Sequence, residues 1–162
     1  MLDKDSFCDL IRVHEKSMYA LAFSIVRNDA DAAEVISEAI YRAYKNLSSL
    51  KDIKSFKPWI LKIIHNSAVD YIRKNAKTVS LDEVELPDEG VENEIIKTVS
   101  LRKAVDKLSP PYRTAIILYY YEDLSIAQIA NITNTTIITV KQHLSRARKQ
   151  LRETLKEEFW YE

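Results

Sequence analysis

Glycine is almost absent from this chain. It occurs once in 162 residues, at Gly90, and proline occurs four times. Tight β-turns and phosphate-binding loops depend on glycine, because glycine enters the left-handed region of backbone space without steric cost. Apolar residues make up 46% of the chain and charged residues 30%, so the chain can bury a core. The sequence therefore predicts an all-α protein.

Apolar residues recur at spacings of three and four along most of the chain, which is the pattern of amphipathic helices. This pattern predicts helices over residues 4–26, 30–47, 59–77, 95–108 and 112–121, a short helix from Ser125 and a long basic helix at the C-terminus. We therefore expect two small helical domains, 1–76 and 95–162. Residues 77–94 hold seven acids and one base together with Pro87 and Gly90, and are predicted to form a flexible acidic linker.

Several classes of protein are excluded by what the sequence lacks. The single Cys8 rules out an intramolecular disulfide and a Cys-rich zinc site. No apolar run reaches the roughly 18 residues that span a bilayer, and no signal peptide opens the chain, so we expect a cytoplasmic protein without membrane insertion. His14 and His65 lie on or beside apolar faces, where a core histidine is commoner than a metal ligand. With no catalytic motif, we expect no enzyme activity, no cofactor and no small-molecule substrate.

The formal net charge is zero, but basic residues are concentrated in two places. Six bases and one acid lie between Thr139 and Lys156, and a second basic stretch covers residues 51–77. Attraction of a polyanion to a surface depends on local charge more than on the total. Both stretches are therefore candidates for nucleic-acid binding.

Residues 124–151 hold a short apolar helix, a polar break with the letters ITNTT and a longer basic helix, which is the pattern of a helix-turn-helix. In the break, Asn134 is the best candidate for a left-handed turn residue, and Thr135 is the candidate cap of the second helix. The residues of that helix that must pack inward are Val140, Leu144, Ala147 and Leu151. The opposite, basic face of the helix is then left exposed.

Such a helix fits the major groove of DNA, where its N-terminal residues meet the edges of the nucleobases and its later Arg and Lys residues meet phosphates. The candidate DNA contacts are Thr136, Thr139, Lys141, Gln142, His143, Ser145, Arg146, Arg148 and Lys149. Of these, Lys141, Gln142 and Ser145 are assigned to the edges of the nucleobases. The basic residues Arg146, Arg148 and Lys149 are assigned to phosphates. The competing interpretation is a solvated basic face on an ordinary bundle helix.

Two parts of the chain resemble extracytoplasmic-function sigma factors, the small branch of the sigma-70 family. In the C-terminal half, similarity to region 4 covers the stretch LSPPYRTAIILYYYEDLSIAQIANITNTTIITVKQHLSRARKQLRE. In the N-terminal half, similarity to region 2.2 covers DADAAEVISEAIYRAYKNL, and similarity to regions 2.3 and 2.4 covers SFKPWILKIIHNSAVDYIRK. The resemblance implies an alternative sigma factor that binds core RNA polymerase and directs initiation at its own promoters. Residues 95–162 would read the minus-thirty-five element as duplex, and residues 1–76 would capture the minus-ten strand.

The resemblance also assigns contacts to individual residues. Core polymerase would be bound by Glu34, Ser37, Glu38, Tyr41 and Arg42, and the alternative is an exposed polar face without a partner. The melted minus-ten strand would be held by Lys51, Lys54, Phe56, Lys57, Lys62, Asn66 and Arg73, which supply positive charge and an amide that both donates and accepts. Trp59 is assigned to the core rather than to base stacking because it lies on the apolar face of its helix.

Regulation and promoter preference follow from the same resemblance. Family members are commonly held inactive by an anti-sigma factor, frequently membrane-anchored, and such a partner is expected here. The family threads its linker toward the polymerase active centre, and a solvated spacer is the alternative for residues 77–94. This chain departs from the family's usual residues at Ser37, Ile40, Tyr44, Asn134, Ile138, Gln142 and His143, with glycine usual at Asn134 and Ile138. We expect Gln142 and His143 to set this protein's promoter preference.

Two other functions compete with the sigma factor. A stand-alone helix-turn-helix regulator, with residues 1–75 sensing an effector or dimerising, would bind duplex operator DNA without polymerase, usually as a symmetric dimer. A protein-binding adaptor with a vestigial DNA helix would keep its function when Arg146 and Arg148 are replaced by alanine. A sigma factor would instead require core polymerase before it acts on a promoter.

Overall fold

The computed structural model describes residues 2–76 and 93–159, with side chains described for 2–76 and 100–156. Every regular element in these ranges is helical, which confirms the all-α prediction. The predicted linker, 77–94, lies outside the described residues except for its last two, which begin a helix. Among the described residues, no helix has the length and apolar character needed to cross a membrane.

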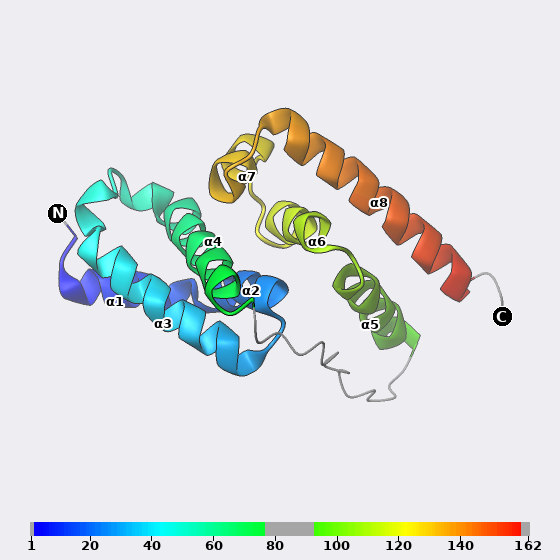
Figure 1. Ribbon diagram of the computed structural model, residues 1–162, viewed down its shortest axis with the longest axis horizontal. Helices are drawn as coiled ribbons and strands as arrows, with labels where there is room; N and C mark the ends of the chain where they lie inside the picture. The colour runs from blue at the N-terminus through cyan, green and yellow to red at the C-terminus, as the bar shows by residue number, and fades with distance from the viewer. Residues whose placement is uncertain (1, 77–92, 160–162) are drawn as a thin grey trace.

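The N-terminal bundle consists of α1 (Lys4–Val13), α2 (Glu15–Val26), α3 (Asp29–Lys45) and α4 (Phe56–Lys74), with two short 3-10 turns between α3 and α4 (Figure 1). The single helix predicted over 4–26 is wrong, because the backbone of His14 leaves helical geometry and separates α1 from α2. The centre of this bundle is fully buried and consists of Met18, Leu21, Val35, Ile60, Leu61 and Ile64. Packing of α2, α3 and α4 around these side chains holds the bundle together.

The C-terminal bundle consists of α5 (Asn93–Asp106), α6 (Pro110–Ile116), a π-helical turn (Ile117–Tyr121), α7 (Ile126–Thr133) and α8 (Ile137–Phe159). Helix α6 begins at Pro110, two residues earlier than predicted, because proline suits the first helical positions, where its missing N–H is not needed. Helix α4 likewise begins at Phe56, with Pro58 in its first turn. The buried residues of this bundle include Leu118, Ile129, Ile132, Val140 and Leu144.

The two bundles pack against each other. Helix α7 lies on α4 and helix α6 on α2, while α8 runs along the far side of the C-terminal bundle (Figure 1). Buried apolar residues from both bundles form one continuous cluster. This contact brings the helix-turn-helix against the basic helix α4.

Candidate nucleic-acid interface

Local hydrogen bonds shape the helix-turn-helix. The Ser125 hydroxyl accepts from the Gln128 N–H at 3.1 Å, and the Gln128 side chain accepts from the Ser125 N–H at 3.0 Å, which completes a capping box at the start of α7. Asn134 has φ 58° and ψ 39°, as predicted for a left-handed turn residue. The side-chain amide of asparagine makes this conformation accessible without glycine. Helix α7 therefore ends at the residue that the sequence predicts.

The cap of α8 is Thr136, so its assignment to Thr135 is wrong. The Thr136 hydroxyl accepts from the Thr139 N–H at 3.1 Å. Thr135 instead belongs to the end of α7, because its N–H donates to the Ala130 carbonyl at 3.0 Å. The chain thus needs one more residue than predicted before the second helix can begin.

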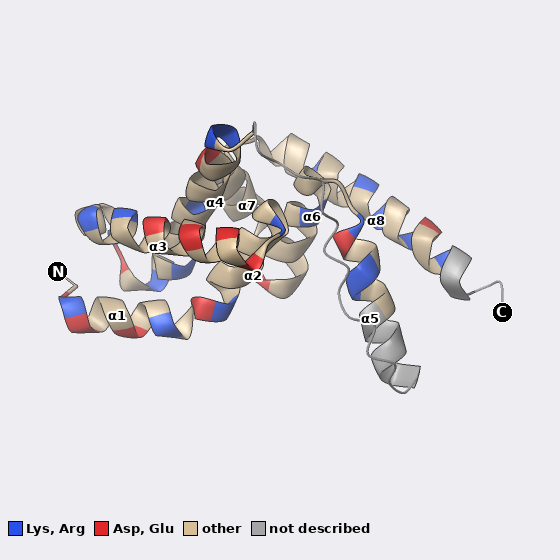
Figure 2. Cartoon of the chain, turned by 60° about the horizontal axis from the view of Figure 1, so that its bottom comes forward, with Lys and Arg blue, Asp and Glu red and all other residues tan. Residues whose placement is uncertain are grey.

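Helix α8 packs on the bundle through one apolar face, and its opposite, polar face is exposed to solvent. Val140, Leu144 and Ala147 are each 1% exposed or less and pack into the C-terminal bundle, as predicted. The exposed side chains among the predicted DNA contacts are Thr136, Lys141, Gln142, Ser145, Arg146 and Lys149, and Thr139 is half-buried beside them. Figure 2 shows Lys and Arg recurring along this helix. The structure therefore brings these seven residues together on one accessible surface.

His143 and Arg148 are turned toward the body of the bundle. The His143 ring lies 5.5 Å from the ring of Tyr112 in an edge-on arrangement. Its partial burial, reinforced by the nearby Arg146, lowers the pKa of His143 below its ordinary value. The Arg148 Nε donates to the Tyr120 hydroxyl at 2.7 Å, and its guanidinium lies over the Tyr120 ring. Both side chains are thus held beside the exposed face rather than at its centre.

The N-terminal bundle presents a second basic surface, on and before α4. Lys51, Lys54 and Arg73 are exposed. Phe56, assigned to the minus-ten strand, is 1% exposed here, and its ring packs against Trp59 in the core. Trp59 is half-buried, and its indole N–H donates to Ser49 Oγ at 3.0 Å.

Two lysines of this surface bond to the C-terminal bundle. Lys57 Nζ lies 2.9 Å from the carbonyl oxygen of Glu122 and 3.2 Å from its carboxylate, which is buried. Lys62 Nζ donates to Asn131 Oδ1 at 3.3 Å. Both lysines are only partly exposed as a result.

Asn66 of the same surface bonds to the turn of the helix-turn-helix. The amide of Asn134 donates to Asn66 Oδ1 at 3.0 Å, across 68 residues of sequence. One residue therefore serves as both the left-handed turn and the contact with α4.

The residues predicted to bind polymerase lie on α3. Glu34, Ser37, Glu38 and Tyr41 are exposed. Arg42 is partly covered because it forms ion pairs with Glu38 and Asp70, each at 3.0 Å, and the Asp70 hydrogen bond raises the pKa of Arg42. The other four side chains form an accessible stripe along the helix.

Comparison with known proteins follows the division into two bundles. The family model for sigma-70 region 2 matches residues 10–78, and the model for sigma-70 region 4 matches residues 98–151. RNA polymerase sigma factor SigV of Bacillus subtilis is 36% identical over 147 residues, which are 90% of this chain and 88% of that protein. The chain belongs to the sigma-70 family, in its extracytoplasmic-function branch.

Other comparisons agree with this family. The extracytoplasmic-function sigma factor SigW of Bacillus subtilis is 29% identical over 171 residues, covering 96% of this chain and 91% of SigW. The sigma factor RpoE of Bartonella quintana, solved with the anti-sigma factor NepR, shares 25% identity and a TM-score of 0.76 over 95% of this chain and 98% of its own. CnrH, solved with the cytosolic domain of CnrY, shows the same fold at 18% identity and a TM-score of 0.68, over 96% of this chain and 90% of its own.

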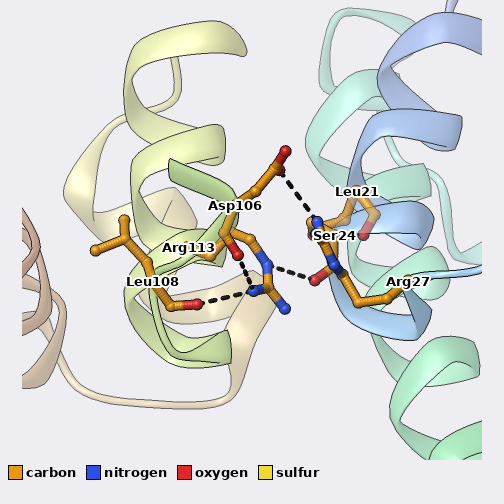
Figure 3. Close-up of polar contacts among 6 residues, drawn as sticks. All are labelled: Leu21, Ser24, Arg27, Asp106, Leu108 and Arg113. Atoms are coloured by element: carbon orange, nitrogen blue, oxygen red, sulfur yellow. Dashed lines mark hydrogen bonds and ion pairs between the residues drawn. The ribbon is translucent and has the colours of Figure 1, made fainter. Parts of the chain in front are cut away.

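In this sigma factor, Arg113 joins the two bundles (Figure 3). Its Nε donates to the Ser24 carbonyl of α2 at 2.8 Å, while Nη1 donates to the carbonyls of Leu108 at 2.8 Å and Asp106 at 3.2 Å. Burial, with a further contribution from Arg27, lowers the pKa of Arg113 to about 10, so the guanidinium remains charged at neutral pH.

A second polar link lies beside Arg113. Arg27, in the left-handed conformation at the end of α2, forms an ion pair at 3.1 Å with Asp106 at the end of α5 (Figure 3). Sequence reasoning missed Ser24, Arg27, Asp106 and Glu122 as residues of the bundle interface. Their partners lie 65 to 89 residues away in the sequence, and no local motif marks such pairs.

Proposed function

We propose that this chain is an alternative sigma factor that binds bacterial core RNA polymerase and directs promoter-specific initiation. The observation that carries the proposal is the combination, in one sigma-70 family chain, of an exposed basic recognition helix with a second basic surface on α4. Its role is binding, and RNA synthesis is catalysed by the polymerase. Its place of action is the bacterial cytoplasm, where core polymerase works.

Helix α8 is proposed to read the minus-thirty-five element as duplex DNA. Its apolar face fixes the helix on the bundle through Val140 and Leu144, while Lys141, Gln142 and Ser145 remain free to face base edges. The exposed Arg146 and Lys149 follow within two turns, where they can meet phosphates.

The surface of α4 is proposed to hold the minus-ten strand. Lys51, Lys54 and Arg73 are accessible for backbone contacts. Lys57 and Asn66 are assigned to the same strand, but α7 and the residues flanking it occupy them here. The promoter-bound form proposed for the chain therefore has α7 displaced from α4.

Two protein partners are proposed. Core polymerase would bind the stripe of exposed residues on α3 that runs from Glu34 to Tyr41. An anti-sigma factor would hold the chain inactive, and the support for it is the likeness to RpoE, which was solved in complex with NepR.

Reconstituted transcription tests the proposed function. The purified chain, core polymerase alone and their mixture would each be supplied with genomic templates. We expect new start sites only in the mixture, with two shared elements upstream of them. Specific binding to duplex operators without polymerase would favour the stand-alone regulator instead. Absence of any new start site would contradict the proposal, provided that circular dichroism shows the purified chain to be folded.

Capture of core polymerase provides a matched pair of variants. Tyr41 on α3 and Tyr121 in the C-terminal bundle are each 56% exposed. Tyr41→Ala should weaken the capture of core polymerase severalfold, because exposed aromatic anchors dominate many interfaces, and Tyr121→Ala should leave it unchanged. Equal effects of the two substitutions would remove α3 from the proposed polymerase surface.

A further inference from the structure

We propose that Ile138 reads the methyl group of a thymine in the upstream promoter element. The inference rests on the proposed function, since it requires α8 to enter the major groove. Ile138 lies in the first turn of α8, two residues after the cap Thr136, and is 69% exposed. The sequence alone assigned it no contact with DNA.

Helix geometry puts Ile138 on the line that faces the groove. Successive residues of an α-helix are about 100° apart around the axis, so Ile138, Gln142, Ser145 and Lys149 fall within an arc of about 60°. The buried Val140 and Ala147 lie on the opposite side. When α8 is seated by these residues, Ile138 is therefore presented outward beside Gln142, in the N-terminal turn that meets base edges.

Among the residues that the structure describes, the core gives this side chain no packing role. Ile138 is absent from the residues that pack against the described core. It also gives no local advantage, because a β-branched residue is a weaker helix former than alanine or glutamate. An exposed isoleucine by itself is common on protein surfaces. Its position in the groove-facing arc is what assigns it a function.

The chemistry of the groove selects the base. The edges of the four base pairs offer donors and acceptors in the major groove, and their one apolar group is the C5-methyl of thymine. The isoleucine side chain forms no hydrogen bonds. If it packed against a donor or acceptor of a base, it would displace the water bonded to that group without replacing the hydrogen bond. The thymine methyl is therefore the group that Ile138 can bury with a favourable change in binding free energy.

Deoxyuridine tests the inference because it removes this methyl group and leaves base pairing intact. On a promoter that the wild-type holoenzyme transcribes, each thymine of the upstream element would be replaced in turn, on either strand. We expect one replacement to lower the yield of specific transcript at limiting holoenzyme about fourfold, the value of one buried methyl group. Ile138→Ala should lower the yield on the unmodified template by a similar factor and should make the thymine and uracil templates equivalent.

A matched control is Val13→Ala, which shortens another exposed β-branched side chain, 73% exposed on α1 and outside both proposed DNA surfaces. This variant should retain the fourfold response to deoxyuridine. The inference is overturned by a wild-type holoenzyme that is indifferent to every replacement, or by an Ile138→Ala holoenzyme that keeps the wild-type response. Failure of the wild-type holoenzyme to transcribe any unmodified template would instead overturn the proposed function, and this inference with it.

Discussion

The two basic surfaces of this sigma factor differ in what they contact. On α8, Lys141, Gln142 and Ser145, the side chains proposed to face the groove, are exposed. On α4, Lys57 and Asn66 are bonded to the C-terminal bundle. One proposed DNA surface is therefore open in this structure and the other is partly covered.

The contacts of the covered α4 surface show which chemical groups its side chains can bind. Lys57 bonds to a carboxylate and a carbonyl oxygen, and Asn66 accepts from an amide. A nucleic-acid strand offers the same types of group, as phosphate oxygens and base edges. Binding of the minus-ten strand to this surface, as proposed, would therefore compete with contacts between the bundles, whereas on α8 the side chain bonded to another element is Arg148, at the edge of the exposed face.

The largest effect is expected at Arg113, which links the bundles. Arg113→Ala leaves the carbonyls of Ser24, Asp106 and Leu108 without this donor and should lower the free energy of unfolding by about 3 kcal/mol. Urea denaturation followed by circular dichroism measures the change. Arg27→Ala removes a partly exposed ion pair of the same interface and should lower it by less than about 1 kcal/mol. Equal losses for the two variants would show that Arg113 is not the main polar link.

A smaller effect is expected on the open surface. Replacing both Arg146 and Lys149 with alanine should reduce transcription about tenfold at physiological salt and should lower the slope of log K against log salt by about 2, because two phosphate contacts are lost. Titration of holoenzyme on a promoter at several salt concentrations measures both quantities. Replacing the exposed Lys4 and Lys16 of the N-terminal bundle removes the same charge and should change neither. An unchanged slope in the α8 variant would remove these residues from the DNA contact.

The smallest effect is expected at Glu122, which covers Lys57. Glu122→Gln weakens this internal contact and should raise the affinity of the free chain for a single-stranded minus-ten oligonucleotide about fivefold, or about 1 kcal/mol. Fluorescence anisotropy of the labelled oligonucleotide follows the change. Glu15→Gln removes the same charge from an exposed position and is the control. A gain of the same size in both variants would mean that net charge, rather than uncovering of Lys57, is responsible.

Local features of the fold could be read from the sequence. The capping box of Ser125 and Gln128, the left-handed Asn134 and the inward face of α8 each depend on residues within a few positions of one another. The errors at His14 and Thr135 are also local, but each depends on one backbone angle or one N–H that side-chain patterns do not determine.

Long-range features could not be predicted in this way. The burial of Phe56 results from packing with Phe7 and Trp59, and the covering of Lys57 and Asn66 results from contacts with residues 65 and 68 positions away. A basic or polar residue reads the same in sequence whether it faces solvent, DNA or another part of the chain. Only the packing of the two bundles separates these cases.

Covalent tethering of the two bundles tests most directly whether the covered surface must open. With Cys8 replaced by serine, cysteines at Arg27 and Asp106 would be joined by a short cleavable bis-maleimide, since these side chains meet at 3.1 Å outside both DNA surfaces. Promoter-specific transcription would be measured before and after cleavage of the linker. The proposed displacement of α7 from α4 predicts that the tethered chain is inactive and that cleavage restores activity. Equal transcription by the tethered and cleaved chains would contradict this displacement.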